Sequence, residues 1–369
     1  MQVSAGLVGL PNVGKSTLFN ALTKSSVPAE NYPFCTITPH TAITAVPDKR
    51  LNILKKIYNS GQIIPSTIKF VDIAGLVKGA SSGAGLGNQF LSHIREVDLI
   101  IHVIRCFEDK DIIRSEPLNP LDDFDTIMTE LILRDIESVT KRQEKRNSLL
   151  KSARSKPQEL AALEQEGKAL EKITAALNSS DIATLQMFRN CTDIPKDLLL
   201  ATKNYLIVAN LGESEYTIDQ IENNQYIQAL RSRFGHERII PLSARLAHDL
   251  SVLTDEEAQD MLNLLNAPDS GLSSLIEAAY TSLNRITFFT CGPREIHAWP
   301  INNGITIREA AGEIHSDLQK GFICAEIIPF HEMNITQSET KIKLEGKMRT
   351  EGQEYIVQDG DIVNIKFNV

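Results

Sequence analysis

The chain has 369 residues, of which 42% are hydrophobic and 23% charged, and its formal net charge is −9. This length allows two or three domains, and the acidic balance excludes a protein that coats nucleic acid with its whole surface. Five scattered cysteines without a Cys-x-x-Cys pair indicate reduced thiols and provide no zinc site. Because the chain has no long apolar run and enters a strand without a signal segment, we predict a cytoplasmic protein with no membrane contact.

The first motif along the chain is Gly9-Leu-Pro-Asn-Val-Gly14-Lys15-Ser16-Thr17, between an apolar run at 5–8 and a predicted helix at 18–22. Strand, glycine-bounded loop, Lys-Ser and helix form the pattern of a phosphate-binding P-loop. The loop amides and the positive end of the helix bind polyphosphate. Lys15 is expected to reach the β- and γ-phosphates, and Ser16 to hold Mg²⁺. The predicted nucleotide-binding residues here are Asn12, Val13, Gly14, Lys15, Ser16 and Thr17.

Alternating strands and helices follow the P-loop. Apolar or alternating runs predict strands at 41–46, 65–72, 99–104, 205–209 and 239–240, with a helix at 90–97. This alternation predicts an α/β fold with a doubly wound, mostly parallel sheet. Its ligand is expected at the carboxyl ends of the strands.

A long polar segment interrupts these strands between residues 121 and 177. Its apolar residues keep roughly helical spacing, so we predict two antiparallel helices with a turn near 155–157. Seven basic residues and one acid, Glu144, gather toward the turn; the basic ones are Lys141, Arg142, Lys145, Arg146, Lys151, Arg154 and Lys156. Two interpretations stay open: a solvated helix end, or a basic finger for RNA or the ribosome.

The pattern changes after residue 244. Helices are predicted at 255–265 and 272–283, followed by strands at 286–290 and 296–299, a helix at 307–320, and strands at 323–328 and 361–367. Such a tail suits a small α+β domain that begins near residue 284. We therefore predict a nucleotide-binding domain at 1–120 and 198–283, a helical insertion at 121–197 and a C-terminal domain at 284–369.

Two motifs downstream of the P-loop are expected to complete the phosphate site. Thr36 lies where GTPase-like proteins place a threonine that coordinates Mg²⁺ and senses the γ-phosphate, with Thr38 as the local alternative. Asp72-Ile-Ala-Gly75 follows a predicted strand and matches D-x-x-G. Its Asp72 is expected to hold Mg²⁺ through water and the Gly75 amide to contact the γ-phosphate. The alternative role of Asp72 is that of a turn former.

The base-recognition motif departs from that of GTPases. Those enzymes use N-K-x-D, in which the Asp accepts two guanine donors, whereas this chain has Asn210-Leu211-Gly212-Glu213. The longer Glu213 moves the carboxylate outward, and Leu211 offers an apolar surface to the ring. We therefore expect adenine to be preferred. Ser243, in Ser-Ala-Arg after the strand at 239–242, resembles the S-A-K loop that flanks the base.

These motifs together resemble the YchF/Obg-like ATPase family, a branch of the Obg group of P-loop NTPases related to translation factors. The stretches that carry the resemblance are 9–17, 31–36, 70–80, 85–90, 210–213, 346–349 and 357–361. The resemblance covers essentially the whole chain. It implies a G domain, a helical insertion and a C-terminal TGS domain of β-grasp type, and it implies a preference for ATP.

The implied activity is Mg²⁺-dependent hydrolysis of ATP by a switch that binds the ribosome through the helical insertion and the TGS domain. The alternatives are a stress-linked regulatory ATPase that acts on a protein partner, and a GTPase with relaxed base specificity; no DNA partner is expected. Leu76 stands where Ras-type GTPases have the water-orienting Gln, so we expect slow basal turnover. Related NTPases use an Asn at the position of Asn12 to help hold a monovalent cation. Stimulation by K⁺ is therefore a hypothesis, with a local turn role of Asn12 as the alternative.

Overall fold

The structure is a computed structural model that describes residues 3–26, 40–73, 86–108, 117–152, 156–189, 191–195 and 198–368, without the side chains of 86–89 and 255. Thr36, Gly75 and Leu76, on which three of the predictions depend, lie outside these ranges. The chain divides into two compact units. The first comprises Met1–Ser4, Phe19–Phe70 and Ser270–Val369, and the second comprises Ala5–Leu18 and Val71–Asp269. Each unit is described by itself.

Parallel strands form the sheet of the second unit. In spatial order they are β1 (Ser4–Val8), β5 (Leu99–Arg105), β6 (Asn204–Asn210) and β7 (Ile239–Leu242). Beside β1 lies the end of β4 (Thr67–Asp72), where the Ile73 amide donates a hydrogen bond of 3.2 Å to the Leu7 carbonyl oxygen. Every residue of β5 is buried, as expected for a strand covered on both faces. The predicted α/β fold with a parallel sheet is therefore confirmed.

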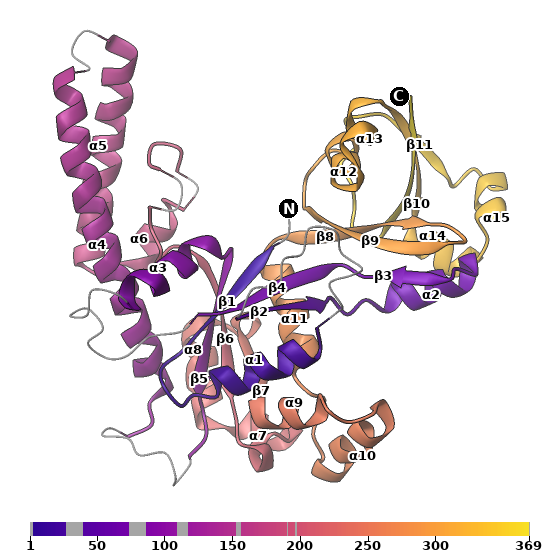
Figure 1. The fold of residues 1–369 in the computed structure, drawn as a ribbon, viewed down its shortest axis with the longest axis horizontal. Helices are drawn as coiled ribbons and strands as arrows, with labels where there is room; N and C mark the ends of the chain where they lie inside the picture. Colours follow the sequence, from indigo (N-terminus) through magenta and orange to yellow (C-terminus); the bar gives the residue numbers. More distant parts are fainter. Residues whose placement is uncertain are drawn as a thin grey trace. The chain divides into compact units, whose positions relative to one another are not determined.

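Helices surround this sheet, and two of them form a long hairpin (Figure 1). The hairpin consists of α4 (Pro120–Ser152) and α5 (Pro157–Asn178), which confirms the predicted antiparallel pair. The other helices of the unit are α3 (Leu86–Glu96), α6 (Ile182–Gln186), α7 (Ile218–Asn223), α8 (Gln225–Phe234), α9 (Ala244–Leu250) and α10 (Asp255–Leu265). Within the described ranges, no helix combines the length and apolar character needed to cross a membrane.

The base of the hairpin packs on the sheet through an aromatic cluster. The ring of His102, in β5, lies 4.7 Å from that of Phe124 in α4, and Phe124 in turn lies 4.5 Å from Phe234 in α8. His102 is fully buried, and this burial lowers its pKa to about 3. The imidazole therefore stays neutral and acts as a core ring.

The first unit contains a six-stranded mixed sheet, in the order β11-β10-β12-β8-β9-β3. Its strands are β3 (Gln62–Ile64), β8 (Arg285–Cys291), β9 (Glu295–Asn302), β10 (Phe322–Pro329), β11 (Arg349–Glu351) and β12 (Asp361–Phe367). Helix α12 (Ile307–Ile314) packs Ile307 and Ala310 against Phe288 and Ile301 on one face. A mixed sheet with a helix across one face is the expected α+β, β-grasp arrangement, which is thus confirmed.

The opposite face of this sheet is covered from an unexpected part of the chain. Helix α2 (Lys49–Tyr58) packs Leu51 and Leu54 against Phe289 and Ile328. Further elements of the unit are β2 (Thr41–Ala45), α11 (Leu272–Ser282), α14 (Phe330–Thr336) and α15 (Glu339–Leu344). Residues 47–64 carried no predicted element, because the apolar partners of α2 are more than 200 residues away in sequence. The predicted domain boundaries stay a prediction.

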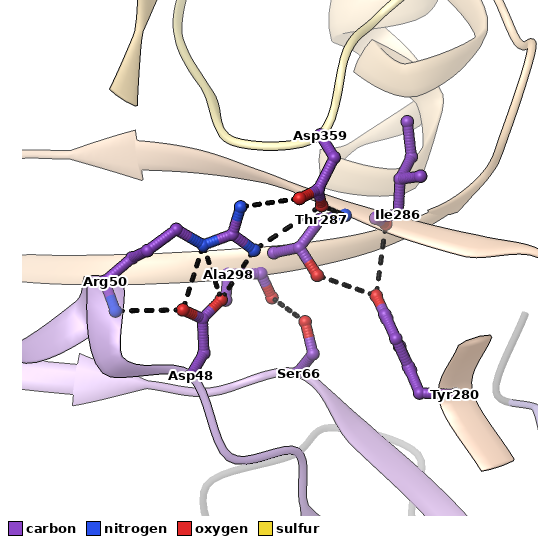
Figure 2. A network of polar contacts seen from close by, with 8 residues as sticks. All are labelled: Asp48, Arg50, Ser66, Tyr280, Ile286, Thr287, Ala298 and Asp359. Carbon is purple, nitrogen blue, oxygen red and sulfur yellow. Dashed lines mark hydrogen bonds and ion pairs between the residues drawn. The ribbon is translucent and has the colours of Figure 1, made fainter. Parts of the chain in front are cut away.

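Polar contacts fix α2 to the C-terminal sheet (Figure 2). The Arg50 guanidinium donates to the carboxylate of Asp48, which precedes α2, and to that of Asp359 at 2.7 Å. Asp359 also accepts a hydrogen bond of 2.9 Å from the Thr287 amide. The Thr287 hydroxyl lies 2.8 Å from the Tyr280 hydroxyl. The Arg50 guanidinium is positive and both carboxylates that accept from it are negative. Its hydrogen bonds to Asp48 and Asp359 are therefore charge-assisted.

One predicted element differs in the structure. The helix expected at 307–320 ends at Ile314, and α13 (Ser316–Lys320) begins after a break at His315. His315 has an extended backbone, and its Nδ1 atom accepts a hydrogen bond of 3.2 Å from the Asp317 amide. The imidazole thereby caps the second helix, which a continuous helix would not allow.

Candidate active site

The predicted site residues of the second unit gather at one edge of its sheet. The P-loop follows β1, Asp72 ends β4, Asn210 ends β6 and Ser243 follows β7. Strands β1, β5, β6 and β7 are parallel, so their carboxyl ends lie along the same edge. The end of β4 lies at this edge beside β1, where the amide of Ile73, the residue after Asp72, donates to the Leu7 carbonyl oxygen. Hydrogen bonds continue past the ends of the strands, from the Leu211 amide to the Leu242 carbonyl oxygen at 2.9 Å. The loops that carry the motifs are thereby held side by side.

Asn210 connects three of these loops. Its Nδ2 atom donates a hydrogen bond of 2.8 Å to the Val13 carbonyl oxygen, and its Oδ1 atom accepts one of 2.9 Å from the Ala244 amide. The residue is 3% exposed. Both ends of the amide are therefore used to fix the P-loop to the loops after β6 and β7, and Asn210 organises the site.

The P-loop has the backbone that its glycines allow. Gly14 has φ +91°, and Asn12 has φ 62°, in the left-handed region. A Cβ atom on Gly14 would lie 2.2 Å from Asn210 Nδ2, which is too close for two such atoms. Gly14 is therefore required by its dihedral angle and by the close approach of Asn210. Helix α1 (Lys15–Lys24) begins directly after it.

Gly14→Ala is expected to lower the free energy of unfolding by about 1–3 kcal/mol through backbone strain, and to weaken nucleotide binding by displacing Asn210. Urea unfolding and ATP titration measure the two effects. Gly212→Ala is a matched control on the same pocket, because Gly212 has φ −65° and an added Cβ would meet nothing closer than 3.5 Å. If Gly14→Ala and Gly212→Ala both bound ATP as tightly as the wild type does, the requirement for glycine at position 14 would be refuted.

The charged residues of the phosphate site lie in contact. Lys15 Nζ and Asp72 Oδ1 form an ion pair, with side chains only 14% and 12% exposed. Ser16, the next residue, is exposed at the start of α1. The Ser16 hydroxyl and the Asp72 carboxylate are hard oxygen ligands of the kind that Mg²⁺ binds, so these residues fit the predicted ion. No group of three or more His, Cys, Asp or Glu side chains in the described part of the chain could hold a metal by itself.

A pocket of about 830 Å³ lies beside the P-loop. It is lined by Asn12, Gly14, Thr17, Phe107, Glu108, Asn210, Leu211, Gly212, Glu213, Ala244 and Arg245. Leu211 is 2% exposed and forms part of the apolar wall, whereas the Glu213 side chain is 40% exposed. The pocket joins the P-loop to the predicted base motif, so its place suits the base and sugar of a nucleotide.

Two lining residues lie outside the motifs that the sequence analysis named. Phe107 and Glu108 follow β5, where a buried strand of an α/β sheet ends at the ligand edge, and that position could have indicated them. Arg245 is the second residue of α9, which begins after Ser243, the residue that follows β7. Its Nε atom lies 3.5 Å from Glu213 Oε1 and 3.5 Å from Asp249 Oδ2.

Ser243 has a structural role in this loop. The residue is fully buried, and its Oγ atom accepts a hydrogen bond of 3.4 Å from the Leu246 amide as the N-cap of α9. Ala244 and Arg245, which follow it, line the pocket. Val13 is likewise buried, and its carbonyl oxygen is the acceptor for Asn210. Direct contacts of Ser243 and Val13 with nucleotide stay predictions.

A phosphate loop after β1, an aspartate at the end of the neighbouring β4 and a base-motif pocket after β6 define a P-loop nucleoside triphosphatase. Two family models match the chain, and the first agrees with this class. One, described as "50S ribosome-binding GTPase", matches residues 4–153. The other, YchF-GTPase_C, described as "Protein of unknown function (DUF933)", matches residues 285–368.

Curated relatives match the chain over its whole length. "Ribosome-binding ATPase YchF" of Escherichia coli O157:H7 is 43% identical over 376 residues, and that of Bacillus subtilis 42% over 374, with 100% of both chains covered in each case. The solved structure of the Schizosaccharomyces pombe YchF GTPase has a TM-score of 0.84 and 35% identity, and the match covers 99% of this chain and 98% of that one. The chain belongs to the YchF family. The relatives' names differ in the nucleotide: ATPase in the bacterial proteins, GTPase in the yeast protein.

Proposed function

We propose that this protein is a Mg²⁺-dependent ATPase that hydrolyses ATP to ADP and phosphate and acts as a nucleotide-dependent switch on the ribosome. The observation that carries the choice of nucleotide is the base pocket, in which Leu211 forms a buried wall and the longer Glu213 replaces the aspartate of GTPases. The bacterial relatives named as ribosome-binding ATPases support this choice and the ribosomal partner. A cytoplasmic location is part of the same proposal.

The chemistry requires that charge be neutralised around the transferred phosphoryl group. The Lys15 ammonium would bind the β- and γ-phosphates, and Ser16 with Asp72 would hold the Mg²⁺, which supplies further neutralisation. Because Lys15 and Asp72 pair with each other in this structure, binding of Mg·ATP has to replace their ion pair with contacts to phosphate and metal. Thr36 and Gly75 are proposed to complete the γ-phosphate site.

Two parts of the proposal concern turnover. Leu76 is proposed to leave the attacking water without an orienting side chain, so that basal hydrolysis is slow and depends on another group or a partner. Asn12 is exposed, lines the pocket and has the left-handed backbone of a tight loop. This position is compatible with the proposed support of K⁺ and equally with a role in its own turn.

The choice of nucleotide is tested by measuring ATP and GTP affinities of the wild type and of Glu213→Asp. We expect the wild type to prefer ATP, and Glu213→Asp to shift the ratio toward GTP by about tenfold, because the shorter acid accepts two guanine donors. Glu213→Gln is the control for loss of charge at the same length. Leu211→Lys is avoided, since it would place an ammonium at a buried position. A wild type that prefers GTP would contradict the proposed ATPase.

The helical hairpin is the proposed contact with ribosomal RNA, and the structure divides five of its seven predicted basic residues into two groups. Of the other two, Arg154 lies outside the described ranges and Lys156 pairs with Glu159 at 2.8 Å. Arg142 pairs with the buried Glu166 of α5, and Arg146 donates a hydrogen bond to the Leu163 carbonyl oxygen. These two arginines therefore hold the helices together. Three lysines of α4 are exposed, namely Lys141, Lys145 and Lys151. The exposed lysines are the part of the predicted basic finger that is available for phosphates.

Lys141→Glu with Lys145→Glu is expected to weaken ribosome co-sedimentation in the presence of a non-hydrolysable ATP analogue by at least about tenfold at moderate salt. The control is Lys168→Glu with Lys172→Glu, an exposed lysine pair with the same spacing on α5. It should sediment nearly as the wild type does. Equal losses in both variants would indicate an effect of net charge alone. Unchanged binding in both, with the analogue and with ADP, would reject the hairpin as the contact.

A further inference from the structure

Arg245 is the cation at the rim of the base pocket, and it stands between two carboxylates. Its Nε atom lies 3.5 Å from Glu213 Oε1, on the loop after β6, and 3.5 Å from Asp249 Oδ2, one turn further along α9. The Arg245 side chain is 75% exposed, whereas Glu213 and Asp249 are 40% and 37% exposed. Burial tends to raise the pKa of Asp249, but the hydrogen bond with His248 and the charge of Arg245 lower it on balance.

The pairing affects the group that would read the base. A carboxylate recognises guanine by accepting hydrogen bonds from the ring N1–H and from the exocyclic amine at once, and adenine has no N1–H to offer. Arg245 pairs with one of the two carboxylate oxygens of Glu213. Only part of the capacity of this carboxylate to accept hydrogen bonds is therefore free. A guanine base must therefore compete with the guanidinium for this carboxylate, whereas adenine does not need both oxygens.

We propose that Arg245 is a specificity-determining residue, which disfavours guanine by holding the Glu213 carboxylate in an ion pair at the rim of the pocket. It is a positioning residue, since it acts through Glu213. This inference rests on the proposed function, because it requires that the pocket bind the base of a nucleoside triphosphate. The length of Glu213 is one reason for discrimination against guanine, and Arg245, in the first turn of α9, provides a second.

Displacement titrations with ATP and GTP on the full-length protein test the inference. Arg245→Ala is expected to shift the affinity ratio toward GTP by about threefold to fivefold, the range that an exposed ion pair allows. In the Glu213→Gln background the same replacement should leave the ratio unchanged, because the carboxylate is gone. Arg245→Lys keeps the charge and should keep the ratio within about twofold of the wild type. Asp249→Asn leaves the pair with Glu213 in place and should not shift the ratio toward GTP.

Salt provides an independent readout. ATP and GTP carry the same phosphate charge, so the effect of salt on phosphate binding cancels in their ratio. Screening of the Arg245–Glu213 pair should then move the wild-type ratio toward GTP as salt rises, and should leave the Arg245→Ala ratio flat. Equal losses of ATP and GTP affinity in Arg245→Ala would overturn the inference, as would a shift that persists with Glu213→Gln. A wild type that prefers GTP would instead reject the proposed ATPase. The comparison of Arg245→Ala in the wild-type and Glu213→Gln backgrounds would still report whether Arg245 acts through Glu213.

Discussion

Lys15→Ala is expected to lower kcat/KM for ATP by about 100-fold to 1,000-fold, the cost of losing one preorganised group at a developing charge. The ammonium of Lys15 is the positive side chain at the P-loop, and it lies in contact with Asp72 where the phosphate site forms. Steady-state phosphate release measures the loss. Circular dichroism and urea unfolding should show a folded protein, because the affected ion pair is at the edge of the site and Asp72 can regain water.

Lys24→Ala is the matched control for Lys15, since it removes the same charge from the last turn of the same helix. It should hydrolyse ATP within about twofold of the wild type, because Lys24 lies about two and a half helical turns from Lys15. Retention of more than a tenth of the wild-type rate by Lys15→Ala would refute the role assigned to Lys15. It would also show that nucleotide is held differently from other P-loop enzymes.

Asp135→Ala is expected to lower the free energy of unfolding by about 2–4 kcal/mol and to loosen the attachment of the hairpin. Asp135, in α4, is fully buried and accepts hydrogen bonds of 2.7 Å from the Leu200 amide and 2.9 Å from the Ala201 amide. Alanine would leave both donors buried without an acceptor. Hydrogen exchange of these two amides measures the effect locally, and Glu144→Ala, at an exposed position of the same helix, is the control. Unchanged protection of the two amides would contradict it.

The contribution of Asp135 should depend on pH. Burial raises the pKa of Asp135 to about 7, although the amides of Leu200 and Ala201 and the charge of Arg95 act to lower it. The folded state therefore holds the proton up to about pH 7, whereas the unfolded chain releases it near 4. The stability due to Asp135 falls between these values as pH rises, by about 1.4 kcal/mol per unit. Urea unfolding at pH 5 and pH 8 should show a larger difference between the wild type and Asp135→Ala at the lower pH; an equal difference would contradict the assignment.

Local sequence determined those features that depend on neighbouring residues. The glycines and Lys-Ser of the P-loop, the apolar runs of β5 and β6 and the alternation of strands and helices fix short segments by themselves, so both the α/β class and the motif loops could be predicted. The predicted helix at 307–320 is an element that local sequence could not determine correctly. Its apolar spacing continues across His315, but the imidazole caps a second helix there, and that contact depends on backbone geometry.

Contacts between residues far apart in the sequence decided the features that local patterns could not predict. Only the tertiary structure shows that α2 packs on the C-terminal sheet, since Arg50 and Asp359 are 309 residues apart. Only it shows that Arg142 and Arg146 of the hairpin bind α5, whereas Lys141, Lys145 and Lys151 are exposed. The sequence determined that this chain has a phosphate loop and an altered base motif, because both lie in contiguous stretches. The tertiary structure decided that Asn210 fixes the loops and that Arg245 meets Glu213, because those side chains come together only when parallel strands end at one edge.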